Sequence, residues 1–186
     1  MLNSILLQIN LDANTLLGIG AIITSVISVI MVILTIGQYN KTKYLEFIKD
    51  VDLEISQQLE KETNLKDRND CIIYAYNYID ICDRVLFLLK KGKISKTFYE
   101  YYRDFFSYAA TMMWWYITIY PQDEHSIKNS WSSLTYWIVN ENIEAYPAFH
   151  LPEAMKNEIG KKKSQMKGAE LCIELIEKIK SIQSKN

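Results

Sequence analysis

The amino-acid sequence predicts an all-α protein, in which a single N-terminal transmembrane helix is followed by a bundle of about four to five helices. The chain has only six Gly and three Pro among its 186 residues, so few residues interrupt helices. Apolar residues recur at intervals of three and four over most of its length, and the alternation typical of strands is rare. One long stretch near the N-terminus contains no charged residue.

That uncharged stretch runs from residue 13 to residue 40 and is mainly apolar over residues 15–37. A helix rises about 1.5 Å per residue, so about 20 apolar residues cross a hydrocarbon core of about 30 Å. We therefore predict a transmembrane helix at 15–37, preceded by a short segment at 1–14. A cleaved signal peptide is the alternative, because Thr35 and Gly37 resemble a cleavage site. The absence of Lys and Arg before the stretch argues against it.

The charges on either side of the stretch predict its orientation. Lys41 and Lys43 follow it directly, whereas Asp12 is the only charged residue before it, and all 21 Lys and Arg lie after residue 40. Lys and Arg are retained on the cytoplasmic side of a membrane. The sequence thus predicts a protein of the cell membrane with its N-terminus outside and its C-terminal domain in the cytoplasm. Lys41 and Lys43 are then expected to contact the surface of the lipid bilayer.

Two features raise the hypothesis of a homodimer. Within the predicted span, Ala21, Ser25 and Ser28 share one helix face, and small residues let two helices approach closely. The next segment, 38–64, is predicted to be a juxtamembrane helix with a heptad-like stripe, which consists of Tyr44, Ile48, Val51, Ile55 and Gln58. A helix packed on its own domain would show the same stripe over two heptads, so both interpretations stay open.

Residues 65–186 predict the helical bundle domain. Gly92 is suited to the end of a helix, Ser95 to the N-cap of the next one, and Pro121 to its end. Gly160 and Gly168 are expected to kink or divide the last helix. The helices predicted in this domain cover approximately residues 67–91, 95–120, 126–142 and 152–184.

The third of these helices contains a second uncharged run, at residues 105–122. A second span or a re-entrant segment is one interpretation of this run. However, Tyr and Trp are spread through its middle instead of gathering at two membrane interfaces, and Arg103 and Asp104 directly precede it. We therefore predict a helix that is buried on most sides within the domain.

Composition and motifs argue against several classes of function. The part of the chain after residue 40 holds 21 basic and 21 acidic residues, whereas a nucleic-acid-binding surface normally requires a basic excess. Cys71, Cys82 and Cys172 are widely separated, and the chain has no CxxC pair of the kind found in zinc and redox sites. Glycine-rich phosphate loops and paired metal-binding histidines are also absent from the sequence. We therefore predict no cofactor, no metal and no enzymatic activity.

Six polar residues are predicted to form a network within the bundle. The second helix carries four of them and the third helix begins with the other two, and the six are Asn77, Asp80, Asp83, Arg84, Arg103 and Asp104. Asp80 and Arg84 have the i, i+4 spacing of an ion pair. The alternative is a reaction centre, because two carboxylates at i, i+3 can perform acid–base chemistry. A reaction centre would need the acids in an open cleft, whereas a structural network would pair or bury them.

Residues 76–115 carry a family resemblance. The residues on which it rests are Asn77, Tyr78, Asp80, Gly92, Ile94 and Trp114 or Trp115. In these the chain resembles an uncharacterised prokaryotic family, whose members pair an N-terminal membrane helix with a small helical domain and have no assigned activity. The family pattern places Glu where this chain has Asp80. The resemblance implies the same domain order, and it implies no catalytic residues.

The function that the sequence predicts is therefore a single-pass membrane protein whose helical domain binds another protein or itself. A membrane-tethered hydrolase or nucleotide-binding effector that uses the acids and Arg103 of the polar network is the alternative. The four Trp and thirteen Tyr are a further unusual feature. They are expected to fill the core of the bundle, and the other interpretation is an aromatic-lined groove for a ligand.

Overall fold

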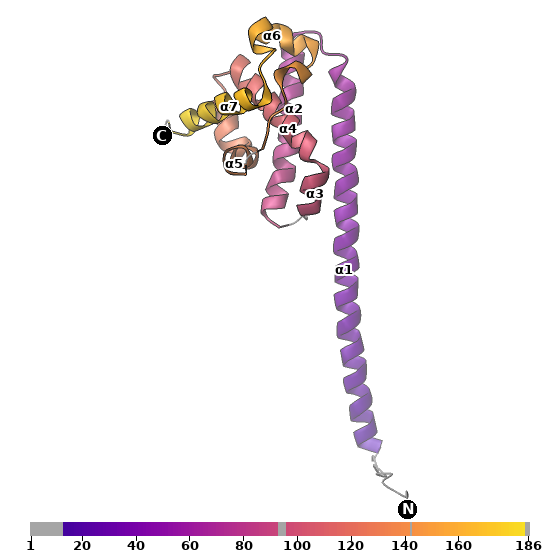
Figure 1. Cartoon of the computed structure of the whole chain (residues 1–186). Coiled ribbons are helices and arrows are strands. Elements are labelled where there is room, and N and C mark those ends of the chain that lie inside the picture. The colour runs from indigo at the N-terminus through magenta and orange to yellow at the C-terminus, as the bar shows by residue number, and fades with distance from the viewer. Residues whose placement is uncertain (1–12, 93–95, 142, 185–186) are drawn as a thin grey trace, which may run out of the picture. The chain divides into compact units, whose positions relative to one another are not determined.

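The computed structural model describes residues 13–92, 96–141 and 143–184, with the side chains of residue 25 onward except residue 44. Within these ranges every regular element is helical and there is no strand, which confirms the predicted all-α class. The elements are α1 (Ala13–Glu62), α2 (Arg68–Lys90), α3 (Lys96–Tyr101), α4 (Arg103–Ile119), η1 (Ser126–Ser130), α5 (Ser132–Asn140), η2 (Ala148–His150), α6 (Glu153–Lys163) and α7 (Gly168–Gln183) (Figure 1).

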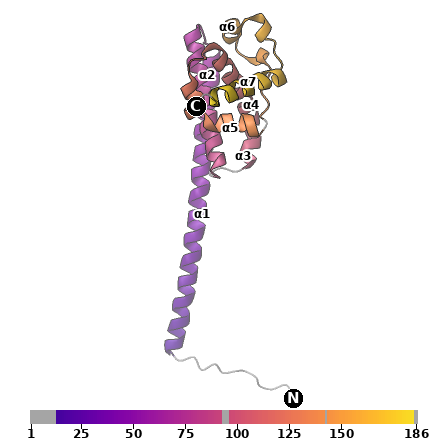
Figure 2. The ribbon, with the colours of Figure 1, turned by 90° about the vertical axis from the view of Figure 1, so that its left-hand side faces the viewer.

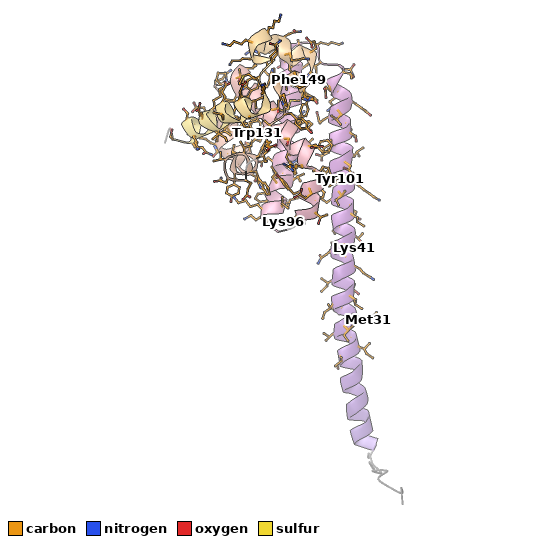
Figure 3. All side chains as sticks on the ribbon, in the orientation of Figure 1. Met31, Lys41, Lys96, Tyr101, Trp131 and Phe149 are labelled. Atoms are coloured by element: carbon orange, nitrogen blue, oxygen red, sulfur yellow. The ribbon has the colours of Figure 1, made fainter. Side chains whose placement is uncertain are left out.

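The chain divides into two compact units, Met1–Ile48 and Lys49–Asn186. In the first unit, the large apolar side chains between Val26 and Ile36 are each 50–62% exposed, and Met31 projects from the helix in Figure 3. No helix among the described residues is long and apolar enough to cross a membrane. Residues 15–24 of the predicted span, including Ala21 of the small-residue face, lie outside the residues whose side chains are described.

In the second unit, the last turns of α1 contribute to the core of the domain. Val51 and Ile55 are each only 5% exposed and Gln58 is 8% exposed. Near them, the Tyr74 hydroxyl donates a hydrogen bond to Glu62 Oε2 over 3.2 Å. These three positions of the heptad-like stripe therefore pack within their own domain, as the second of the two interpretations proposed.

The caps of α2 explain its bounds. At its N-terminus, Asp67 Oδ1 accepts a hydrogen bond from the Asp70 amide over 2.9 Å. At its C-terminus, Gly92 has a φ of 64°, which favours glycine, and its amide donates to Leu89 O over 2.9 Å. Both bounds agree with the predicted helix.

The predicted third helix is divided in two. Its backbone leaves the helical conformation at Tyr102, which separates α3 from α4. Tyr102 is 1% exposed and its hydroxyl donates to the Asp52 carboxylate of α1, so packing of the ring overrides helix continuity. The proposed N-cap, Ser95, lies outside the described residues.

Helix α4 forms the centre of the domain, where it packs against α2 and α7 (Figure 2). All seven residues from Ala109 to Trp115 are fully buried, at 0% exposure. The Trp115 indole N–H also donates to Met155 O of α6 over 2.8 Å. The prediction that the uncharged run 105–122 is mostly a buried helix is thus confirmed.

The predicted fourth and last helices are also divided. The fourth comprises the π-helical turn η1 and then α5, with the change at the buried Trp131, and its predicted end at residue 142 lies outside the described residues. The last comprises α6 and α7, and the backbone of Gly160 is non-helical inside α6, at a φ of 76°. At Gly168 a Cβ atom would lie 2.2 Å from Ala145 O, so only glycine permits this approach. Both glycines weaken the helix, as predicted.

Candidate functional site

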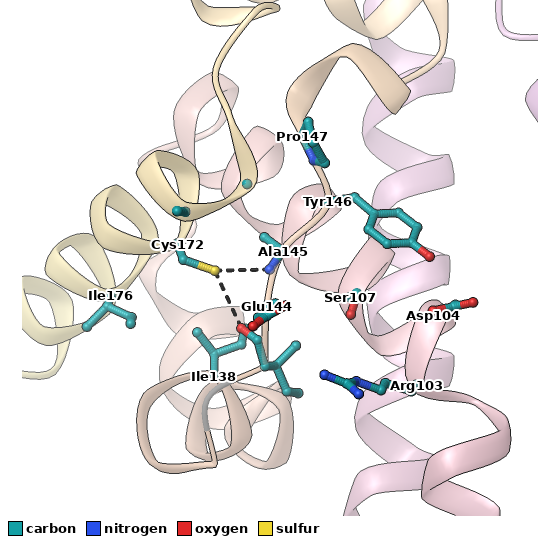
Figure 4. A pocket seen from close by; sticks show the side chains of 13 residues that line it. Arg103, Asp104, Ser107, Ile138, Glu144, Ala145, Tyr146, Pro147, Cys172 and Ile176 are labelled. Carbon is teal, nitrogen blue, oxygen red and sulfur yellow. Dashed lines mark hydrogen bonds between the residues drawn. The ribbon is translucent and has the colours of Figure 1, made fainter.

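A pocket of about 670 Å³ lies beside the irregular segment 143–147, which connects α5 to η2. We call it the Cys172 pocket. Helix α4 supplies Arg103, Asp104 and Ser107, and α7 supplies Cys172 and Ile176 (Figure 4). The segment itself forms a further wall and α5 adds Ile138.

Local hydrogen bonds hold the segment in its irregular conformation. The Cys172 Sγ accepts from the Ala145 amide over 3.0 Å and donates to Ile143 O over 3.4 Å (Figure 4). From the other side, the Thr111 hydroxyl donates to Tyr146 O over 2.9 Å. Burial raises the pKa of the Cys172 thiol, which disfavours the reactive thiolate. Cys172 is half-buried, and the sequence carried no signal for its bonding role.

The walls of the Cys172 pocket combine apolar and charged groups. Ile138 and Ile143 are buried, whereas Arg103, Asp104 and Glu144 are exposed. The apolar lining can bury a hydrophobic group, and charged side chains of both signs can pair with polar atoms beside it. The Cys172 thiol is held in two backbone hydrogen bonds and its pKa is raised, so this pocket is better suited to binding than to nucleophilic chemistry.

Three residues of the predicted polar network come together with Glu54. Arg84 Nη2 lies 2.5 Å from Glu54 Oε2, and Arg84 Nε lies 3.3 Å from Asp80 Oδ2. Asn77 lines the same small pocket, of about 230 Å³, together with the buried Gln58. Because the guanidinium contacts both carboxylates, these acids are paired with a cation.

Asp83 has a different role from its neighbour Asp80. Its side chain is 7% exposed, and Oδ1 accepts a hydrogen bond from the Leu134 amide over 2.7 Å. The Ser133 amide donates to the same carboxylate. Since Trp131 at the start of α5 has no side-chain cap, Asp83 of α2 caps the N-terminus of α5 from another helix. Burial raises the pKa of Asp83 to about 6, and the two backbone bonds oppose this shift.

The structure therefore brings together Asn77, Asp80 and Arg84, and it places Asp83 at α5. Arg103 and Asp104 line the Cys172 pocket. The six predicted residues do not share one pocket among those described. Both lysines predicted at the membrane surface are exposed on α1, and Lys43 Nζ lies 3.3 Å from Glu46 Oε2.

The described residues contain no group of three or more His, Cys, Asp or Glu side chains that could hold a metal ion. His150 is exposed in η2, where its ring lies 5.3 Å from that of Tyr146 and 4.4 Å from that of Phe149. The Nδ1 atom of the His125 ring lies 3.0 Å from Asn129 Nδ2. Both histidines are thus engaged with neighbouring side chains.

Comparison of the chain with family models, curated proteins and solved structures found no match. The resemblance of residues 76–115 to a family of membrane-anchored helical proteins stays a prediction.

Proposed function

We propose that this chain is a single-pass membrane protein whose helical domain, residues 49–186, lies in the cytoplasm and binds a partner protein. The observation that carries the proposal is that α1 changes from uncharged, mainly apolar residues to charged and polar residues after residue 40. Residues 13–40 contain no charge, and nine large apolar side chains between Val26 and Ile36 are at least half exposed. Burying one such side chain contributes about 1.5–3 kcal/mol, so removing this surface from water is strongly favourable.

The proposed orientation rests on the residues that follow the uncharged stretch. Lys41 and Lys43 are exposed, and they are the first charged residues after the uncharged stretch. Positive residues at this position are retained in the cytoplasm and are attracted by anionic headgroups. The N-terminus is then outside the cell.

The proposed mode of action is binding, for which the Cys172 pocket supplies the support. Its isoleucines can receive an apolar side chain of a protein segment, while Arg103 and Glu144 can pair with charges that flank it. The carboxylates of Asp80 and Glu54 are held by Arg84, and Asp83 caps a helix. These roles account for the acids without invoking a reaction.

Membrane anchoring is tested by matched pairs of arginines on α1. Val26→Arg with Val29→Arg places two charges in the proposed span, at side chains that are 53% and 60% exposed. Each Arg near the centre of a span costs about 2.5–3.5 kcal/mol, so the variant should leave the membrane fraction after an alkaline wash. The control is Leu53→Arg with Ser56→Arg, at the same spacing on exposed positions of the same helix. Equal retention of both variants would contradict the anchor.

Orientation and partner binding have separate tests. A reporter that is active only in the cytoplasm should give signal when fused after Asn186, and a silent fusion at normal expression would contradict the orientation.

A photo-crosslinking residue at Ile176 in the Cys172 pocket should yield a discrete adduct in native membranes. The same residue at Ile173, which is 61% exposed on α7, is the control. Adducts of equal yield at both sites would contradict binding in the pocket.

A further inference from the structure

A second pocket, of about 250 Å³, adjoins the Cys172 pocket and shares Asp104 and Tyr146 with it. We call it the aromatic pocket. Its walls carry four aromatic rings, from Tyr78, Phe105, Tyr108 and Tyr146. The last turn of α1 and the first turn of α4 add two carboxylates, those of Glu62 and Asp104. Leu59 and the exposed His150 complete the lining, which contains no Lys or Arg among the described residues.

The rings face several directions. The rings of Tyr78 and Tyr108 meet edge to face, with centroids 5.3 Å apart and planes at 89°. The Tyr146 ring lies 6.4 Å from that of Tyr108, at an interplanar angle of 51°. Tyr78 is 2% exposed, so the half-buried Phe105, Tyr108 and Tyr146 supply most of the aromatic surface that the pocket presents. Aromatic rings attract cations through their negative faces, as in an aromatic cage.

The charge of the pocket agrees with a cationic ligand. The two carboxylates attract positive charge, and the imidazole of His150 is the one basic side chain among the described residues that line the pocket. Burial raises the pKa of the Tyr78 and Tyr108 hydroxyls, so these rings stay neutral and add no competing charge at physiological pH.

Hydrogen bonding in the pocket narrows the class of cation. Glu62 already accepts a hydrogen bond from Tyr74. Asp104 accepts one from Tyr146. Desolvation is the main cause that raises the pKa of the Tyr146 hydroxyl, and this hydrogen bond raises it further. A primary ammonium has three donors and is strongly hydrated, so the aromatic and aliphatic walls offer it little in exchange for its water. An alkylated ammonium donates few or no hydrogen bonds, and its methyl groups pack on aromatic and aliphatic walls.

We infer that the aromatic pocket binds a compact quaternary ammonium group, either of a free small molecule or of a lipid headgroup. The volume of the pocket accommodates such a group, the rings contact its methyls, and the carboxylates balance its charge. This inference goes beyond partner binding in the Cys172 pocket and does not depend on it.

The test uses the full chain in a maltoside detergent and choline as the probe, with intrinsic fluorescence as the readout. Choline should give a saturable change with a Kd below about 1 mM. Its neutral isostere, 3,3-dimethylbutan-1-ol, should bind at least about tenfold more weakly, because it lacks the charge that the cage recognises. No saturable change, or equal binding of both compounds, would overturn the inference.

Two variants locate the binding. Tyr146→Leu removes one ring, and Asp104→Asn removes one charge at an exposed position that should leave folding intact. Each should weaken choline binding by at least about fivefold. Tyr136→Leu is the control, since this tyrosine is 39% exposed on α5 and lies outside the pocket lining. Unchanged affinity in Asp104→Asn and in a folded Tyr146→Leu would overturn the assignment to this pocket.

A further arm separates the two sources of the ligand. The wild-type chain is reconstituted into bilayers of phosphatidylcholine or of phosphatidylglycerol, and choline is titrated into each. Weaker choline binding in phosphatidylcholine alone, with Tyr146→Leu abolishing the difference, supports a headgroup ligand. Equal binding in both bilayers supports a free small molecule.

Discussion

The chain contains two long runs without charge, and they occupy opposite environments. Residues 25–40 of α1 expose large apolar side chains, whereas residues 109–115 of α4 are fully buried. The first run is mainly aliphatic, and within the first unit it belongs to a single helix, α1. The second is rich in Trp and Tyr and has α2, α6 and α7 packed around it. Absence of charge alone therefore does not determine whether a helix is buried within its own domain. The residue types and the surrounding helices determine whether protein or lipid replaces the water around it.

The largest effect that we expect comes from a charge placed in α4. Ala110→Arg puts an unpaired guanidinium at a position with 0% exposure, which costs several kcal/mol and should unfold the domain. The counterpart is Val29→Arg, at a side chain 60% exposed on α1, which should leave the thermal melt of the domain unchanged. A similar loss of melting temperature in both would erase the distinction between the two runs.

A second difference, between the two units that hold these runs, concerns pH. Residues 13–40 contain no acid, base or histidine, whereas the domain buries the carboxyl of Asp83, whose pKa is raised to about 6 from 3.8. The folded state thus binds this proton more tightly, so the Asp83 contribution to stability is complete below about pH 4 and is lost as the pH rises to about 6. Asp83→Asn should remove this dependence while its side-chain oxygen still accepts from Leu134.

Denaturant unfolding between pH 4 and pH 7.5 measures this effect. The stability of Asp83→Asn relative to the wild type should rise by up to about 3 kcal/mol over that interval, from about 1.4 kcal/mol per unit of pKa shift. The fraction of protein that resists membrane extraction should show no such trend. A relative stability that stays flat with pH would contradict the buried, proton-binding Asp83.

The smallest effect that we expect concerns the indole N–H groups of two tryptophans, Trp115 and Trp137. Trp115→Phe removes the donor that bonds Met155 O, and the loss of this hydrogen bond should cost about 0.5–1.5 kcal/mol. Trp137→Phe is the matched variant, since the Trp137 indole nitrogen is buried and has no partner among the described residues. Its free energy of unfolding should change by less than that of Trp115→Phe. The reverse order would mean that the hydrogen bond contributes nothing beyond ring packing.

The sequence predicted those features that depend on local pattern. The start of α2 near residue 67, its end at Gly92 and the burial of α4 follow from residue type and helical spacing, and the structure confirms them. The break at Tyr102 depends on a hydroxyl that reaches Asp52, 50 residues away, so no local pattern could indicate it. The division of the predicted polar network has the same cause. Asp80 and Asp83 are three residues apart, but one faces Arg84 and the other faces α5.

The candidate pockets were less predictable than the helices. Arg103 and Asp104 were expected beside Asp80, but they line the Cys172 pocket because segment 143–147 packs against α4. Gly168 was expected only to weaken a helix, and it also provides the clearance for that segment. The abundance of Tyr had raised the hypothesis of an aromatic groove. The tyrosines of the aromatic pocket come from α2, α4 and the segment 143–147, which are distant in sequence.

The cap that Asp83 provides links the folding of two helices. The first turn of α5 has backbone amides that its own side chains do not cap, so the turn is incomplete until α2 is in place. Opening α5 alone would strand a buried carboxylate without its donors, which makes partial unfolding expensive. Amide hydrogens of Ser133 and Leu134 should therefore exchange with deuterium only in events that also open α2. The two helices then behave as one cooperative unit on the timescale of hydrogen exchange.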